Sequence, residues 1–258
     1  MRIIVAGIGG NVGKSTLAAH LLVPRMNNAK LLIVESINQD TKDLVDDFET
    51  VRGEKFRQIY LELVVNDDLV VDVGASNAED FFAGLTSLNQ GYDEVDFFLI
   101  PTVPGSKEQD ESILTARMLA AMGVDKSKIR IVFNRVRRSV EEEFPVLLNA
   151  AKEFDCFIAN PDCMVFENDI YADLAGLKMP LNEACVFAEN SLHKLKTDLR
   201  KVAKFSEQYF RYARLLNVAK KAGRRQKLSA TPDLSGTVLP LCLIPNSALK
   251  SAPPFKSV

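Results

Sequence analysis

The chain has 258 residues, a length that predicts one or two domains. Its 47% apolar and 26% charged residues exclude wholesale disorder, and no apolar run approaches the roughly 18 residues of a membrane span. The net charge of −2 conceals an asymmetry, because residues 1–193 hold 18 basic and 31 acidic groups whereas residues 194–258 hold 14 and three. Four cysteines lie far apart, which argues against a disulfide framework or a structural zinc site and favours a reducing cytoplasm.

Short apolar segments alternate with segments of helical periodicity along the first two thirds of the chain. We expect strands at residues 2–6, 31–34, 69–73, 97–100, 129–133 and 156–159. We expect helices at residues 16–22, 79–88, 108–122 and 140–154. Buried strands that alternate with helices predict the α/β class, with a mostly parallel sheet covered by helices on both faces.

The remainder of the chain has a different pattern. Residues 182–227 keep a helical period without further strands, and residues 229–258 contain five prolines. We therefore divide the chain into a nucleotide-binding core (1–185), a basic helical extension packed on this core (186–228) and a flexible tail (229–258).

A glycine-rich stretch follows the first expected strand and opens the first expected helix. Glycines let a loop wrap closely round a phosphate chain, so that several backbone N–H groups converge on it. The lysine of such a loop reaches the β- and γ-phosphates, and the next hydroxyl binds Mg²⁺. The predicted nucleotide-binding residues are Gly9, Gly10, Asn11, Val12, Gly13, Lys14, Ser15 and Thr16. The alternative is a glycine-rich turn with a solvated lysine.

Two acidic residues stand at the ends of expected strands. Glu35 follows the second strand, where a carboxylate can position or deprotonate a water molecule, although an ordinary loop acid would look the same. Asp72 ends the strand at 69–73, where an aspartate fits the role of holding Mg²⁺ together with Ser15. The alternative for Asp72 is a cap directed toward Ser76. We predict Lys14, Glu35 and Asp72 as catalytic residues.

Asn134 and Arg135 follow the expected strand at 129–133. An asparagine amide can read a purine edge through paired hydrogen bonds, and a plain turn asparagine fits the spacing almost as well.

These motifs together resemble the ParA/MinD group of P-loop ATPases over about residues 1–185. The loop, followed by Ala18 to Leu22 and by Pro24 to Met26, is most similar to plasmid stability proteins of the StbB type. The resemblance implies a P-loop NTPase fold, ATP and Mg²⁺ as cofactors, a homodimer formed on ATP binding and a plasmid-encoded DNA-binding partner. It also implies that Glu35 activates water in place of the usual aspartate, that Asp72 is the Walker B residue, that Asn134 contacts adenine, and that a second base-side loop contains Pro161 and Asp162.

One position departs from the group. The signature lysine of its phosphate loop precedes the two glycines, and this chain has Ile8 there. In the group that lysine stabilises the transferring phosphate across the dimer. Loss of one cation at the phosphoryl group slows phosphoryl transfer, so we expect weak intrinsic ATPase activity.

The basic C-terminal stretch is a second candidate for function. Ten Lys and Arg residues between positions 200 and 227 favour non-specific DNA contact, with an anionic membrane surface as the alternative target. Together with the resemblance, this implies a cytoplasmic, nucleoid-associated bacterial protein. Our interpretation is an ATP-dependent switch in plasmid stability, partition or conjugative transfer. The rival interpretations are a nucleotide-binding adaptor with little hydrolysis and a small-molecule phosphotransferase.

Overall fold

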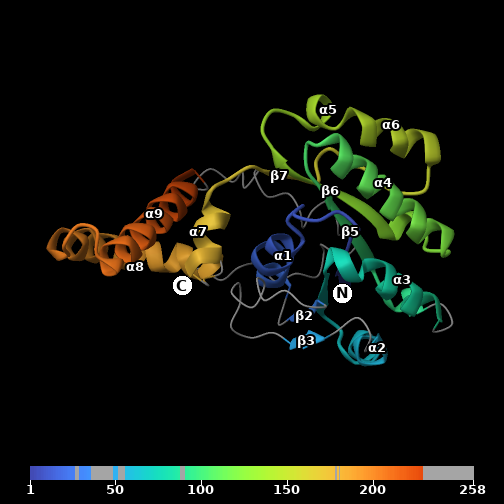
Figure 1. Cartoon of the computed structure of the whole chain (residues 1–258), viewed down its shortest axis with the longest axis horizontal. Coiled ribbons are helices and arrows are strands. Elements are labelled where there is room, and N and C mark those ends of the chain that lie inside the picture. The colour runs from blue at the N-terminus through green and yellow to red at the C-terminus, as the bar shows by residue number, and fades with distance from the viewer. Residues whose placement is uncertain are drawn as a thin grey trace.

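The computed structural model describes residues 1–26, 29–35, 49–51, 56–87, 91–177, 179 and 181–228. These residues form one seven-stranded sheet with the order β3-β2-β4-β1-β5-β6-β7, in which every neighbouring pair is parallel (Figure 1). The strands are β1 (Arg2–Val5), β2 (Lys30–Val34), β3 (Glu49–Val51), β4 (Leu69–Val73), β5 (Phe97–Thr102), β6 (Ile129–Val136) and β7 (Met164–Phe166). The predicted α/β class with a parallel sheet is confirmed.

Helices cover both faces of this sheet. They are α1 (Lys14–Leu17), continued by the π-helix η1 (Ala18–Leu22), α2 (Phe56–Val65), α3 (Ala78–Ser87), α4 (Ser106–Ala121), α5 (Val140–Glu143) and α6 (Pro145–Phe154). The chain continues with α7 (Ile170–Leu177), α8 (Leu181–Lys201) and α9 (Glu207–Leu228). Short 3₁₀ turns lie at Val23–Arg25, Ala75–Asn77, Gly91–Glu94 and Lys126–Lys128.

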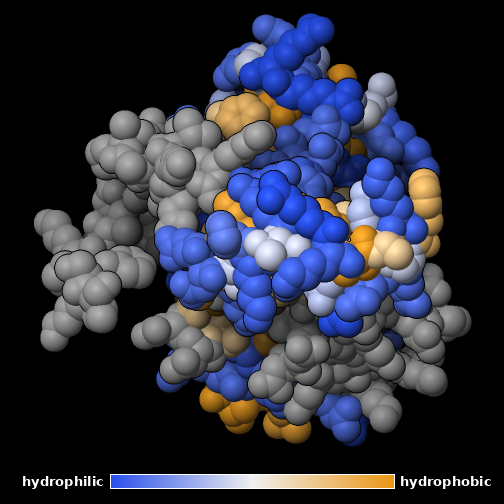
Figure 2. Space-filling model, turned by 90° about the vertical axis from the view of Figure 1, so that its left-hand side faces the viewer, coloured by the Kyte–Doolittle hydropathy of each residue, from blue (hydrophilic) through white to orange (hydrophobic). Residues whose placement is uncertain are grey.

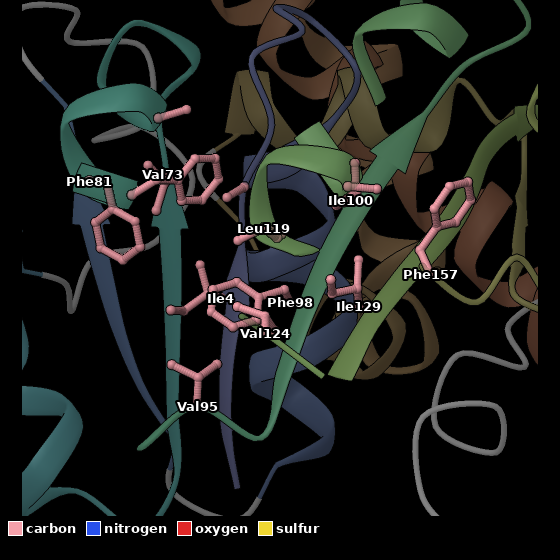
Figure 3. Close-up of a cluster of buried hydrophobic side chains, with 14 of the residues drawn as sticks. Ile4, Val73, Phe81, Val95, Phe98, Ile100, Leu119, Val124, Ile129 and Phe157 are labelled. Carbon is pink, nitrogen blue, oxygen red and sulfur yellow. The ribbon is translucent and has the colours of Figure 1, made fainter. Parts of the chain in front are cut away.

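Alternation along the strands divides the core into two layers, because successive side chains of a strand point to opposite faces. Ile4 of β1 belongs to the larger cluster, which α2 to α6 cover, and Figure 3 shows it beside Phe98 of β5. Ile3 and Val5 belong to the other cluster, which α1 and η1 cover. The strands are therefore mostly apolar, as strands buried on both faces must be, and the polar exceptions include Asp72 of β4 and Asn134 of β6.

The C-terminal helices have an apolar cluster of their own. Leu174 of α7, Leu195 of α8 and Ala219 of α9 are buried in it. Tyr171 of α7 contacts both this cluster and the α1 layer, so α7 joins the helical hairpin of α8 and α9 to the sheet. The hairpin extends away from the sheet (Figure 1). The domain boundary that we predict near residue 185 falls within α8 and stays a prediction.

Several expected elements differ from the structure. The segment at 156–159 is a single bridge between Ile158 and Arg130, and the seventh strand comes later, at Met164–Phe166. The helix expected at 140–154 breaks into α5 and α6 at Pro145, because proline disfavours a helical conformation in the residue before it and lacks a donor.

Three further differences concern α1, α2 and the C-terminal stretch. The helix expected at 16–22 begins at Lys14 and becomes a π-helix at Ala18. The helical stretch at 182–227 is two helices, and β3 and α2 were not predicted. The predicted tail at 229–258 lies outside the described residues.

Candidate nucleotide site

The glycine-rich loop lies at the carboxyl end of β1, between β4 and β5. The chain crosses from one half of the sheet to the other here, and open α/β sheets bind ligands at such a switch point. Asn11 and Gly13 have positive φ values of 56° and 90°. A Cβ atom at Gly13 would lie 2.3 Å from Nδ2 of Asn134, so both conformation and space require glycine.

Lys14 is the first residue of α1, and its side chain turns back under the loop. Its buried ammonium donates hydrogen bonds to the carbonyl oxygens of Gly7 (3.2 Å) and Gly9 (2.5 Å). Burial lowers the pKa of Lys14, whereas the charges of Asp72 and Glu111 raise it. The predicted phosphate-binding lysine is therefore inside the loop, with carboxylates that favour its charged form.

Asp72 and Ser15 meet beneath the loop. Asp72 is 3% exposed, and its pKa is raised to about 6, chiefly by burial. A hydrogen bond with Ser15 and the charge of Lys14 lower this pKa, and the charge of Glu35 raises it. Oδ1 of Asp72 is buried and has no hydrogen-bond partner within the described part of the chain. A buried carboxylate oxygen without a donor, beside a hydroxyl, fits the oxygen ligands that Mg²⁺ prefers.

Glu35 lies next to this pair, at the carboxyl end of β2. The backbone N–H of Gly74, which follows β4, donates to the carbonyl of Val34 at 2.9 Å. A Cβ atom at Gly74 would lie 3.4 Å from Cγ of Glu35, so glycine permits the two strand ends to approach. The structure thus brings Glu35, Asp72, Ser15 and Lys14 together from three different strand ends.

Asn134 contacts the loop directly. Its Nδ2 donates to the carbonyl of Val12 at 2.8 Å, and its Oδ1 accepts from the backbone N–H of Arg135 at 2.9 Å. Arg135 is exposed and has a φ of 55°. The carboxamide therefore braces the phosphate loop, a role that spacing did not indicate. Its contact with adenine stays a prediction.

Pro161 and Asp162 lie in the turn before β7. The backbone N–H of Asp162 donates to Oδ1 of Asn160 at 3.0 Å. The turn adjoins the end of β6, because Phe133 donates its N–H to the carbonyl of Cys163 at 2.9 Å. Pro161 and Asp162 are thus near the same sheet end as Asn134, and their contact with a base stays a prediction.

Sequence reasoning missed the contribution of α4. Glu111 acts on the charge of Lys14, and its Oε2 lies 3.0 Å from the position of a Cβ atom at Gly9. Thr115, one turn later, accepts a hydrogen bond from the N–H of Ile8 at 3.2 Å. Polar residues at positions 107, 111 and 115 share one helix face, and this spacing was the feature of the sequence that could have indicated the role of α4.

No family model matches this sequence, and no curated protein matches it either. Solved structures with a similar arrangement include a chain of the MinC:MinD cell division protein complex of Aquifex aeolicus, at 15% identity and a TM-score of 0.49, over 85% of this chain and 94% of that one. Apo McdA of Cyanothece is similar at 14% identity and a TM-score of 0.46, over 86% and 98% of the two chains. The septum site-determining protein MinD of Pyrococcus horikoshii, complexed with Mg-ADP, is similar at 15% identity and a TM-score of 0.45, over 89% and 99%.

Proposed function

We propose that this chain is a Mg²⁺-dependent ATPase of the ParA/MinD type that acts as an ATP-controlled switch. The observation that carries the proposal is the position of Lys14 inside a glycine-rich loop, where its charge acts on Asp72, the hydrogen-bond partner of Ser15. Glycine-rich loops with this lysine and hydroxyl bind the phosphates and the metal of nucleoside triphosphates. The similarity of the loop to StbB-type proteins supports a role in plasmid stability, partition or conjugative transfer.

The residues of the site have distinct roles in this proposal. Loop N–H groups and Lys14 hold the phosphate oxygens, and Ser15 and Asp72 hold Mg²⁺, which supplies positive charge at the phosphates when bound. Glu35 accepts a proton from the attacking water molecule while the oxygen of that water molecule bonds to the γ-phosphorus. The bond from that phosphorus to the bridging oxygen breaks, and its electron pair leaves with ADP.

Isothermal titration calorimetry with Mg·ATP tests this proposal. Wild-type protein should bind Mg·ATP, and Lys14→Ala should abolish binding while circular dichroism shows a folded protein. Lys196→Ala, which removes an exposed lysine of α8, is the matched control and should bind as the wild type does. Failure of the folded wild type to bind Mg·ATP, or normal binding by Lys14→Ala, would refute the proposal.

A second candidate, a nucleotide-binding adaptor with little hydrolysis, is favoured by Ile8. This side chain packs on the main apolar cluster and offers no charge to a phosphate. Glu35→Ala separates the two candidates, since it should abolish the biological activity of a hydrolytic switch and leave that of an adaptor intact. Plasmid retention in cells measures this activity.

We further propose that the protein works in the bacterial cytoplasm, dimerises on ATP binding and acts with a plasmid-encoded DNA-binding partner. No helix in the described ranges is long and apolar enough to cross a membrane. The side of the molecule that carries the α8–α9 hairpin is largely hydrophilic (Figure 2). Its exposed cations include Lys196, Lys201, Lys204 and Lys220, which fits non-specific contact with DNA and nucleoid association.

Binding to random duplex DNA at several salt concentrations tests this surface. Lys221 is a poor choice for the test, because its ammonium pairs with Asp173 at 2.9 Å. Conversion of Lys196, Lys201, Lys204 and Lys220 to glutamine should weaken DNA binding and reduce its dependence on salt. Unchanged binding would exclude the hairpin as the DNA surface, and binding of anionic vesicles instead would favour the membrane alternative.

A further inference from the structure

Helix α4 forms a wall of the phosphate loop. Glu111 approaches Gly9 closely, with its Cβ 3.7 Å and its Oε2 3.0 Å from the position of a glycine Cβ. Thr115 accepts the N–H of Ile8, and its Oγ1 lies 3.9 Å from a Cβ position at Gly7. The first half of the loop therefore contacts side chains of α4, and a phosphate chain held by the loop would lie near this helix.

Several carboxylates act on the charges below the loop. Asp72 and Glu111 act on the ammonium of Lys14, and Glu35 acts on the carboxylate of Asp72. A triphosphate brings further negative charge to the loop. Transfer of its γ-phosphoryl group requires cations placed where charge develops. Mg²⁺ at Ser15 and Asp72 would supply part of this charge. Ile8 supplies none, although it lies at the edge of the loop.

Lys107 is the cation that α4 brings to this edge. It lies one turn before Glu111, and its Nζ is 3.6 Å from Oε1 of Glu111, the carboxylate that reaches Gly9. The Lys107 side chain is 80% exposed, and exposed ion pairs of this kind are weak. Its ammonium can therefore leave Glu111 for a more highly charged anion without a large loss.

We propose that Lys107 is the cation that stabilises the terminal phosphate of a nucleoside triphosphate bound in this loop. Glu111 is its positioning residue, since one oxygen of its carboxylate pairs with the ammonium and the other lies against Gly9. This inference rests on the proposed ATPase function, and it explains how a loop with Ile8 can still hydrolyse ATP. It also predicts that Lys107 matters for the triphosphate and not for the diphosphate.

Single-turnover hydrolysis of radiolabelled Mg·ATP, together with calorimetry of Mg·ADP, tests this role. Lys107→Gln should slow hydrolysis about 100-fold, the usual effect of removing one donor at the reacting group, and leave the Kd of Mg·ADP within about twofold. Lys107→Arg should restore most of the rate, because it keeps the charge. Lys126→Gln, which breaks another exposed ion pair, with Asp155, is the matched control and should hydrolyse ATP at the wild-type rate.

The outcomes separate this inference from the function on which it rests. A wild-type rate in Lys107→Gln would overturn the role of Lys107 and leave the ATPase intact. An equal loss of Mg·ADP affinity would also overturn it, since it would indicate a structural effect on the loop. Absence of both Mg·ADP binding and hydrolysis in the wild type would overturn the ATPase function together with the inference.

Discussion

Two buried groups, Asp72 of β4 and His20 of η1, titrate in the same pH range with opposite effects on stability. Burial raises the pKa of Asp72 from 3.8 to about 6. Burial lowers the pKa of His20, in the π-helix η1, from 6.5 to about 4. The ring of His20 is 1% exposed, neither of its nitrogens has a hydrogen-bond partner among the described residues, and it lies 6.1 Å from the ring of Tyr171.

The two effects have opposite signs and similar size. Because the folded-state pKa of Asp72 is raised, its contribution to stability is complete below pH 3.8 and is lost as the pH rises through about 6. Because the folded-state pKa of His20 is lowered, its contribution is complete above pH 6.5 and is lost as the pH falls through about 4. At 1.36 kcal/mol per pKa unit, each amounts to about 3 kcal/mol. The two contributions should cancel in the wild type.

Single substitutions should therefore reveal how each group changes the free energy of unfolding with pH. In Asp72→Asn, the free energy of unfolding should rise by about 3 kcal/mol between pH 4 and pH 7, because His20 alone remains. In His20→Phe, it should fall by a similar amount over the same range, because Asp72 alone remains. The free energy of unfolding of the wild type should change little between pH 4 and pH 7.

Urea unfolding of the nucleotide-free protein at half-unit pH steps measures these slopes. Asp80→Asn and His193→Gln remove exposed groups and are the matched controls, which should follow the wild type. Parallel pH profiles for the wild type, Asp72→Asn and His20→Phe would show that burial of these two groups does not control the pH dependence.

Four further substitutions test the local geometry. Gly13→Ala should destabilise the fold by at least about 1–2 kcal/mol, because φ is 90° and Asn134 occupies the space, whereas Gly10→Ala has open space and should be nearly neutral in thermal unfolding. Asn134→Ala should cost about 1 kcal/mol, since the Val12 carbonyl loses its donor, and equal stability of Asn134→Ala and wild type in urea would contradict the brace. Gly84→Ala should cost about 1–3 kcal/mol, because its Cβ would lie 2.5 Å from the Phe56 ring, and an unchanged Tm would show that α2 moves aside freely.

Local sequence was sufficient for the elements near the phosphate loop. A β-branched run that ends at glycine favours a strand and a turn, and Lys14 and Ser15 follow within the same glycine-rich loop. Local patterns failed where distant residues decided the structure. Ile158 pairs only at one point with Arg130, since the turn at Asn160 and Pro161 redirects the chain before it pairs again at Met164.

In the candidate site, too, local sequence determined some features and tertiary structure determined others. Sequence alone determined which residues could bind a phosphate chain and a metal, since Gly, Lys, Ser and Asp carry those groups wherever they lie. Only the tertiary structure decided that Glu35 and Asp72 meet, because the strand order places β4 between β2 and β1. It also decided that Glu111 reaches Gly9 and that Asn134 braces Val12. These contacts join residues far apart in the chain, and their existence depends on how the sheet orders its strands.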